Sequence, residues 1–229
     1  MPSSSLQVGT RVWLREEAGP RPYSLAEVIS ASASGGLRLR LLETGGGKEV
    51  AANPRDIFLA AASDAATETD NCSLSNLSDA SLLHNTKARL LQGDIYTFTG
   101  DIVTSVNPCY SLPALYSVAR MQEVCIGELT HAHPHVFVVC ERAYRQLRHF
   151  QRQQALVISG VSGAGKTEAA KYCLRYLCWR SRPGDPAGAE GGVGGERVDE
   201  PLTNAILRSN PVFEALGNAT TVRGRSARA

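Results

Sequence analysis

A glycine-rich run at residues 160–167 has the residue types and the spacing of a phosphate-binding loop. Gly160 is followed, after four residues, by Gly165, Lys166 and Thr167, and this order matches the phosphate-loop pattern in full. Glycines let the backbone turn so tightly that successive N–H groups point into one concavity and can bind an anion. Lys166 would reach the β- and γ-phosphates of a nucleotide, and the hydroxyl of Thr167 would bind Mg²⁺.

Such a loop needs a strand before it and a helix after it. Residues 155–158 are wholly apolar (Ala-Leu-Val-Ile), and they predict a short strand covered on both faces, as in a parallel sheet. The helix predicted after the loop would add the positive end of its dipole to the anion site. Its apolar stripe consists of Ala170, Cys173, Leu174, Leu177 and Cys178. A glycine-rich turn that carries Lys and Thr by chance is the alternative, and the flanking pattern disfavours it.

Another helix is predicted to start after Pro134 and to end at residue 150. Its spacing places apolar side chains on one face, and these are Val136, Val139, Cys140, Ala143, Leu147 and Phe150. Charged residues fall largely on other faces, and these are Glu141, Arg142, Arg145 and Arg148. We interpret the arginines as a solvated helix face and not as a basic patch, because the net charge of the chain is only +2.

The first quarter of the chain has the pattern of a small β-domain. Residues 37–41 alternate leucine and arginine, which predicts a half-buried strand, and glycine clusters mark turns on both sides of it. We therefore predict a small β-barrel at residues 6–60, with strands at 8–14, 25–29 and 37–41.

The next segments connect this barrel to the phosphate loop. Residues 61–79 are rich in Ala, Ser, Thr, Asn and Asp and are predicted to form a linker. A helix is predicted at 81–91 with Asp79 as its N-cap. Two β-rich runs, at residues 95–98 and 102–106, predict a hairpin.

Composition and small motifs narrow the class of protein. Hydrophobic residues make up 43% of the chain and charged residues 20%, which favours a globular protein. No apolar run approaches the ~18 residues of a membrane span, and the start lacks the order of a signal peptide. The cysteines are scattered and favour a reducing compartment: Cys72, Cys109, Cys125, Cys140, Cys173 and Cys178. The three histidines at positions 131, 133 and 135 are interpreted as structural or solvent-facing, since no Cys or carboxylate has matching spacing.

Several segments, in the same order, resemble the motor head of the myosin family. The run from Gly160 to Glu168 is similar to the family's loop, which reads Gly-Glu-Ser-Gly-Ala-Gly-Lys-Thr-Glu. Further similar segments are residues 83–85 with 95–100, 106–108 with 115–116, 134–137 with 143–144, and 210–219 with 221–223. The β-rich start also resembles the SH3-like domain that precedes many myosin heads. The chain thus resembles the N-terminal part of an unconventional myosin.

This resemblance implies an α/β P-loop NTPase fold, as a motor-head fragment preceded by a small SH3-like β-barrel. It implies a barrel at residues 6–60, a linker at 61–79, and a partial motor domain with the P-loop at 80–229. The glycine-rich stretch 181–198 would border the nucleotide entrance. The implied cofactors are ATP and Mg²⁺. The implied partners are actin filaments, without nucleic acid or membrane, and the implied location is the cytoplasm and its cytoskeleton.

The resemblance also implies the roles of individual residues. The phosphates would be held by Gly160, Val161, Ser162, Gly163, Ala164, Gly165, Lys166 and Thr167, and Thr167 would be the metal ligand. The adenine pocket would be lined by Asn107, Pro108 and Tyr116. No catalytic residue is assigned.

Two departures from the family pattern bear on activity. Val161 stands where the family has Glu, so an ion pair is lost while the backbone contacts are kept, and hydrolysis is affected more than binding. After Arg223 the family continues into switch I, which ends in Ser-Ser-Arg, whereas this chain reads Gly-Arg-Ser-Ala-Arg-Ala. We expect switch I, switch II, the actin-binding surface and the lever to be absent from the 229 residues. On this expectation the chain alone binds Mg-nucleotide weakly or not at all, and it does not act as a motor. Two alternatives stay open: a nucleotide-binding remnant or truncated isoform, and a different P-loop kinase or NTPase.

Overall fold

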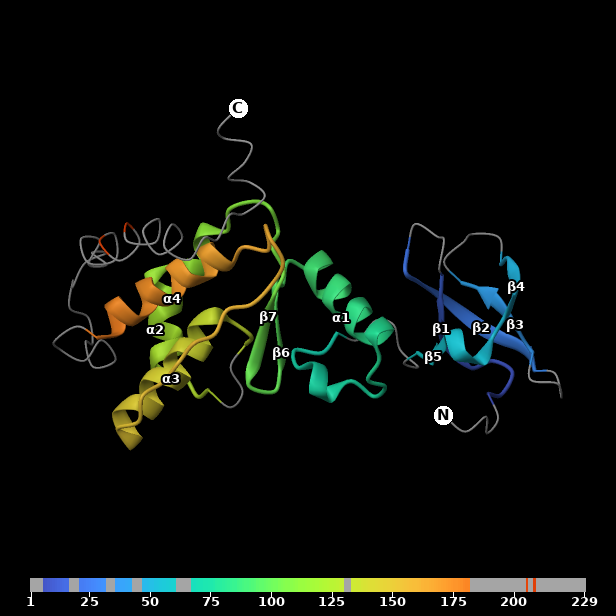
Figure 1. The fold of residues 1–229 in the computed structure, drawn as a ribbon, viewed down its shortest axis with the longest axis horizontal. Helices are drawn as coiled ribbons and strands as arrows, with labels where there is room; N and C mark the ends of the chain where they lie inside the picture. Colours follow the sequence, from blue (N-terminus) through green and yellow to red (C-terminus); the bar gives the residue numbers. More distant parts are fainter. Residues whose placement is uncertain are drawn as a thin grey trace, which may run out of the picture. The chain divides into compact units, whose positions relative to one another are not determined.

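The chain divides into two compact units, Met1–Asp94 and Ile95–Ala229, each described by itself below (Figure 1). The computed structural model describes residues 6–16, 21–31, 36–42, 47–60, 67–129 and 133–181, together with the helical positions Ala205 and Arg208. Apart from Ser181, Ala205 and Arg208, the loop predicted at 181–198 and the segment that leads to residue 223 lie outside the described residues.

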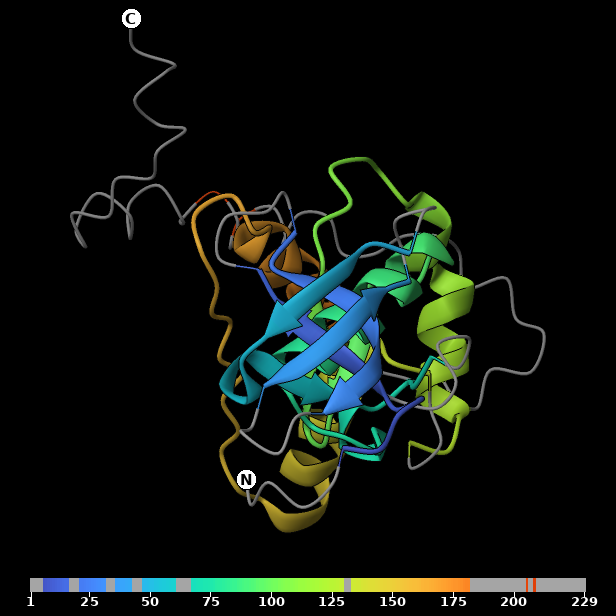
Figure 2. The same ribbon diagram turned by 90° about the vertical axis from the view of Figure 1, so that its right-hand side faces the viewer.

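The first unit contains a five-stranded antiparallel sheet. Its strands are β1 (Arg11–Arg15), β2 (Tyr23–Ala31), β3 (Leu37–Leu41), β4 (Glu49–Ala52) and β5 (Ile57–Leu59), in the order β4-β3-β2-β1-β5. Figure 2 shows these strands in blue, side by side. The three predicted strands are confirmed, although the first begins at Arg11 and not at residue 8, and β3 buries its leucines while its arginines are exposed. Among the described strands β4 and β5 form the two edges of the sheet, so the closed barrel stays a prediction.

Helix α1 (Asp79–Leu91) belongs to the same unit. It is capped by Ser78, whose hydroxyl accepts a hydrogen bond from the N–H of Ser81 at 3.2 Å. The predicted cap, Asp79, is instead the first helical residue, where a carboxylate favours the positive end of the helix dipole. The described part of the predicted linker packs on this helix, because the amide of Asn85 donates to Glu68 O at 3.0 Å and to the side chain of Asn71 at 2.8 Å.

The second unit begins with the predicted hairpin and continues with helices. Strands β6 (Tyr96–Thr99) and β7 (Ile102–Ser105) pair antiparallel, which confirms the hairpin. A short 3-10 helix at Pro113–Tyr116 leads into α2 (Val118–Ile126), which the sequence analysis did not predict. Helices α3 (Val136–Phe150) and α4 (Lys166–Arg180) follow, and α3 packs against both α2 and α4. Figure 1 shows the three helices together on one side of the hairpin.

The predicted apolar face of α3 is only partly correct. Val136 and Cys140 are buried, but the side chains of Leu147 and Phe150 lie in the exposed last turns of the helix. Glu141 was predicted to lie largely off the apolar face, yet it is completely buried. The reason is that α3 extends beyond its neighbours at its C-terminal end (Figure 1), while the middle of the helix faces basic and hydroxyl partners on α4.

The strand predicted at residues 155–158 does not form. The segment from Gln151 to Gly160 is neither helix nor strand, and Val157 is 89% exposed. No described strand pairs with it, and a strand without a partner leaves its N–H and C=O groups to water. The prediction of a buried strand is therefore wrong for the structure as described.

Candidate phosphate-binding site

The glycines of residues 160–167 shape a turn that leads directly into α4. Gly163 and Gly165 have φ angles of +81° and +93°, in the left-handed region that glycine adopts without strain. Gly165 is the N-cap of α4, and having no side chain it makes no capping hydrogen bond. The first N–H groups of the helix consequently face the loop without a capping side chain, which is the arrangement that favours a bound anion.

Lys166 lies across this turn. Its Nζ donates to the carbonyl oxygens of Gly160 at 2.7 Å and Val161 at 2.9 Å. The loop is closed further by a hydrogen bond from the N–H of Ala164 to Val161 O at 3.2 Å. Thr167 is exposed in the first turn of α4. The ammonium group and the hydroxyl thus lie at the same end of the helix, one residue apart.

Two of the residues predicted to line an adenine pocket contact the loop or its helix. The amide of Asn107 donates to Gly163 O at 2.9 Å. The ring of Tyr116 stacks on that of Tyr172 of α4, with centroids 3.5 Å apart and planes 5° apart. Tyr116 is buried. Pro108 is half-buried next to Asn107.

The hydroxyl of Tyr116 is tied to the hairpin. It lies 2.8 Å from the hydroxyl of Tyr96 in β6. Burial raises the pKa of Tyr96, and the hydroxyl of Tyr116 raises it further. Burial also raises the pKa of Tyr116. Both phenols are therefore neutral at physiological pH, and the pair acts as a structural link between β6 and the segment beside the phosphate loop.

His135 is a structural residue, as the sequence analysis predicted. It is completely buried, its Nδ1 accepts from the N–H of Phe137 at 3.0 Å as the N-cap of α3, and its Nε2 lies 3.1 Å from Leu115 O. Burial, together with the charge of Arg120, lowers its pKa to about 3, although the Leu115 carbonyl opposes this shift. His133 is exposed, and His131 lies outside the described residues. Within the part of the chain that the structure describes, no three His, Cys, Asp or Glu side chains are grouped for a metal ion.

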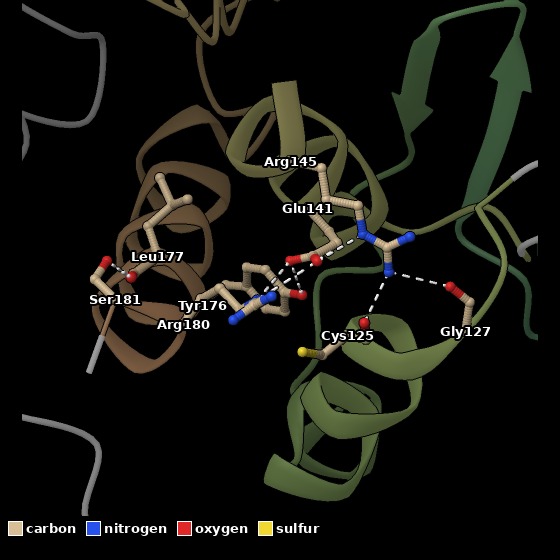
Figure 3. A network of polar contacts seen from close by, with 8 residues as sticks. All are labelled: Cys125, Gly127, Glu141, Arg145, Tyr176, Leu177, Arg180 and Ser181. Atoms are coloured by element: carbon tan, nitrogen blue, oxygen red, sulfur yellow. Dashed lines mark hydrogen bonds and ion pairs between the residues drawn. The ribbon is translucent and has the colours of Figure 1, made fainter. Parts of the chain in front are cut away.

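A buried network centred on Glu141, which the spacing of α3 did not predict, links α3 to α4 (Figure 3). Its carboxylate accepts from Arg145 Nε at 2.8 Å, from the hydroxyl of Tyr176 at 2.9 Å and from Arg180 Nε at 3.1 Å. Burial and the carboxylate together raise the pKa of Tyr176. The network fixes the C-terminal half of α4, the helix whose N-terminus carries the phosphate loop.

Two of the arginines interpreted as a solvated face are in fact tethered. Arg145 also donates to Cys125 O at 2.7 Å and Gly127 O at 3.1 Å, at the end of α2. Arg142 donates to Leu129 O at 3.1 Å and lies over the ring of Phe98, 4.9 Å from its centroid. Their spacing gave no hint of this, because the partners lie on other elements.

A comparison with protein families gives the family of the chain. The family model "Myosin head (motor domain)" matches residues 68–228 of the chain. The chain belongs to the myosin head family. It is 38% identical to unconventional myosin-VI of Bos taurus over 157 residues, and this alignment covers 69% of this chain and 11% of that protein. It is 39% identical to unconventional myosin-Ia of Gallus gallus over 160 residues, and this alignment covers 70% of this chain and 14% of that protein.

A third relative extends the similarity to the β-rich unit. Myosin-15 of Arabidopsis thaliana is 34% identical over 223 residues, which covers 96% of this chain and 13% of that myosin. The chain thus spans between 11% and 14% of the length of these three myosins. The resemblance to an N-terminal portion of the myosin head is confirmed. No helix among the described residues is long and apolar enough to cross a membrane.

Proposed function

We propose that this chain contributes the phosphate loop and the adenine-side loop of a myosin-type ATPase head. The observation that carries this proposal is the turn at residues 160–165, which ends on an α4 N-terminus without a capping side chain and is crossed by the ammonium group of Lys166. The backbone N–H groups at the start of α4 would bind the phosphate oxygens of ATP. Lys166 would leave the two loop carbonyls and bind the β- and γ-phosphates instead.

The residues around the loop fit Mg-ATP. Thr167 offers a hydroxyl in the first turn of the helix, which suits the Mg²⁺ that accompanies the triphosphate. Asn107, Pro108 and Tyr116 belong to the segment next to the loop and would position the adenine. Bound Mg²⁺ would neutralise charge on the phosphates during their transfer to water. The protein's own part is to orient those phosphates through its backbone and Lys166.

The wider assignments follow from family membership. Myosins are actin-based motors, so the proposed partner of the whole protein is the actin filament and its proposed location is the cytoskeleton in the cytoplasm. The sheet of the first unit is proposed to be an SH3-like barrel, and the second unit to carry the P-loop NTPase fold. One alternative is nucleotide binding without turnover. Val161, exposed where the family has a glutamate, favours it because the side chain cannot form an ion pair.

Titration of the full chain with a fluorescent Mg-ATP analogue tests the proposed site. Lys166→Ala should abolish the saturable signal, because it removes the positive charge that would bind the β- and γ-phosphates. Lys171→Ala is the matched control, since Lys171 lies on the same helix and pairs with Glu168 at 2.7 Å on the surface. Equal binding by Lys166→Ala and the parent would show that the nucleotide is held elsewhere.

A further inference from the structure

We propose that Asn107 is a positioning residue that holds the phosphate loop in its binding conformation, in addition to any contact it makes with adenine. This inference rests on the proposed function. The side-chain amide of Asn107 donates to Gly163 O at 2.9 Å, a residue 56 positions later in the chain. Its other amide atom, Oδ1, accepts from the N–H of Cys109 at 2.9 Å. The two contacts together fix which way the amide points.

The hydrogen bond to Gly163 fixes the orientation of one peptide group of the loop. In a trans peptide the carbonyl of one residue and the N–H of the next point in opposite directions. The plane between Gly163 and Ala164 therefore directs its carbonyl to Asn107 and its N–H to Val161 O, at 3.2 Å. Asn107 and the internal hydrogen bond select the same orientation of this plane, immediately before Gly165, the N-cap of α4.

Among the described residues, the other side-chain contact of the loop lies within the turn itself. Lys166 donates to the carbonyls of Gly160 and Val161. Those carbonyls are also the contacts that Lys166 would give up on binding a phosphate. The Asn107 bond uses neither the lysine nor the N–H groups at the start of α4, so it can persist when the phosphates are bound.

Asn107 is itself held by structure at the other end of its segment. Tyr116 stacks on Tyr172, which lies in the second turn of α4, and its hydroxyl contacts Tyr96 in β6. The start of the segment is held by a turn at residues 107–109, in which the N–H of Cys109 donates to Asn107 Oδ1. The segment 107–116 thus contacts the loop at one end and the helix that follows it at the other.

Two ligands separate positioning of the loop from recognition of the base. Inorganic tripolyphosphate with Mg²⁺ offers the phosphate groups without adenine, and Mg-ATP offers both. Asn107→Ser keeps a short oxygen that can accept from Cys109 N–H, but it is too short to reach Gly163. We expect this neutral variant to weaken tripolyphosphate binding about two- to tenfold, for one lost hydrogen bond, and to weaken Mg-ATP binding by at least the same factor.

The control is Ser111→Ala, a substitution at an exposed position of the same segment, which should leave both affinities unchanged. Weaker Mg-ATP binding with unchanged tripolyphosphate binding would assign Asn107 to the base alone and overturn the inference. No change for either ligand in Asn107→Ser would overturn it as well. If Lys166→Ala does not affect binding, the proposed nucleotide site is wrong, whereas the positioning role of Asn107 is judged by the Asn107→Ser result.

Hydrogen exchange in the ligand-free chain tests the role of Asn107 independently of nucleotide binding. The N–H of Ala164 is hydrogen-bonded to Val161 O, so its hydrogen exchange reports whether the turn stays closed. Exchange at Ala164, followed by NMR in the full chain, should be faster in Asn107→Ser than in the parent and unchanged in Ser111→Ala. Equal exchange rates in Asn107→Ser and the parent would show that the loop does not depend on Asn107.

Discussion

Replacing Glu141 should destabilise the second unit more than any change at a surface charge. The carboxylate is completely buried and has three partners between 2.8 and 3.1 Å. Glu141→Ala would remove the Glu141 carboxylate from the guanidinium of Arg180, whose side chain is 16% exposed, and from the hydroxyl of the buried Tyr176. Breaking a buried ion pair in this way costs about 3–5 kcal/mol of the free energy of unfolding. Glu141→Gln keeps one acceptor and the shape of the side chain, so we expect a smaller loss of about 1.5–3 kcal/mol.

The two tryptophans allow the two units to be followed separately. Trp13 lies in β1 of the first unit, and Trp179 lies in α4, with its ring 5.8 Å from that of Tyr176. In a Trp13→Phe background, urea unfolding monitored by fluorescence reports the region around Trp179. The free energies of unfolding of the Glu141 variants are compared in that background.

A surface ion pair on the same helix provides the control. Glu168 pairs with Lys171 at 2.7 Å, and the two side chains are 61% and 41% exposed. Glu168→Ala should therefore change the free energy of unfolding by less than about 1 kcal/mol. The reasoning is refuted if Glu141→Ala destabilises the Trp179 region no more than Glu168→Ala does.

Three further predictions concern residues around the site. His135 has a pKa of about 3, below the ~6.5 of an unfolded histidine. Between these values only the unfolded chain takes up the proton, so the free energy of unfolding decreases as the pH is lowered. Urea unfolding at pH 7 and pH 5 should show a loss of about 2 kcal/mol from this group, and a smaller loss in His135→Asn. Tyr116→Phe keeps the stack but removes the hydrogen bond between the two tyrosine hydroxyls, and the same unfolding assay should show a cost of about 1 kcal/mol. Val161→Glu should leave Mg-ATP affinity within about twofold, because backbone N–H groups hold the phosphates, and should raise phosphate release; unchanged release would remove the case for a turnover defect at Val161.

Local patterns predicted the elements that depend on neighbouring residues. The alternation at Leu37–Leu41 gave a strand with its leucines buried, and the glycine spacing gave a turn that opens a helix at Lys166. His135 was interpreted as structural because no ligand partners were spaced with it. In each case the information lies within one turn or one strand of the residue concerned.

Long-range partners could not be predicted in this way. An apolar run such as residues 155–158 indicates burial but does not say which strand pairs with it. Glu141 points inward because Tyr176 and Arg180 lie 35 and 39 residues later, and a helical wheel of α3 contains neither. The contact of Asn107 with Gly163 spans 56 residues. These contacts depend on how elements pack, which spacing along one segment does not encode.

Hydrogen exchange in the presence of Mg-ATP tests the central claim most directly. The amides of residues 163–167 in the full chain should exchange more slowly when Mg-ATP is added at millimolar concentration, because the phosphates would bind their N–H groups. The amides of β3 (Leu37–Leu41) serve as the internal reference and should not change, and Lys166→Ala should lose the effect. Protection that is absent from 163–167, or that appears equally in Lys166→Ala, would contradict the assignment of this loop as the nucleotide site.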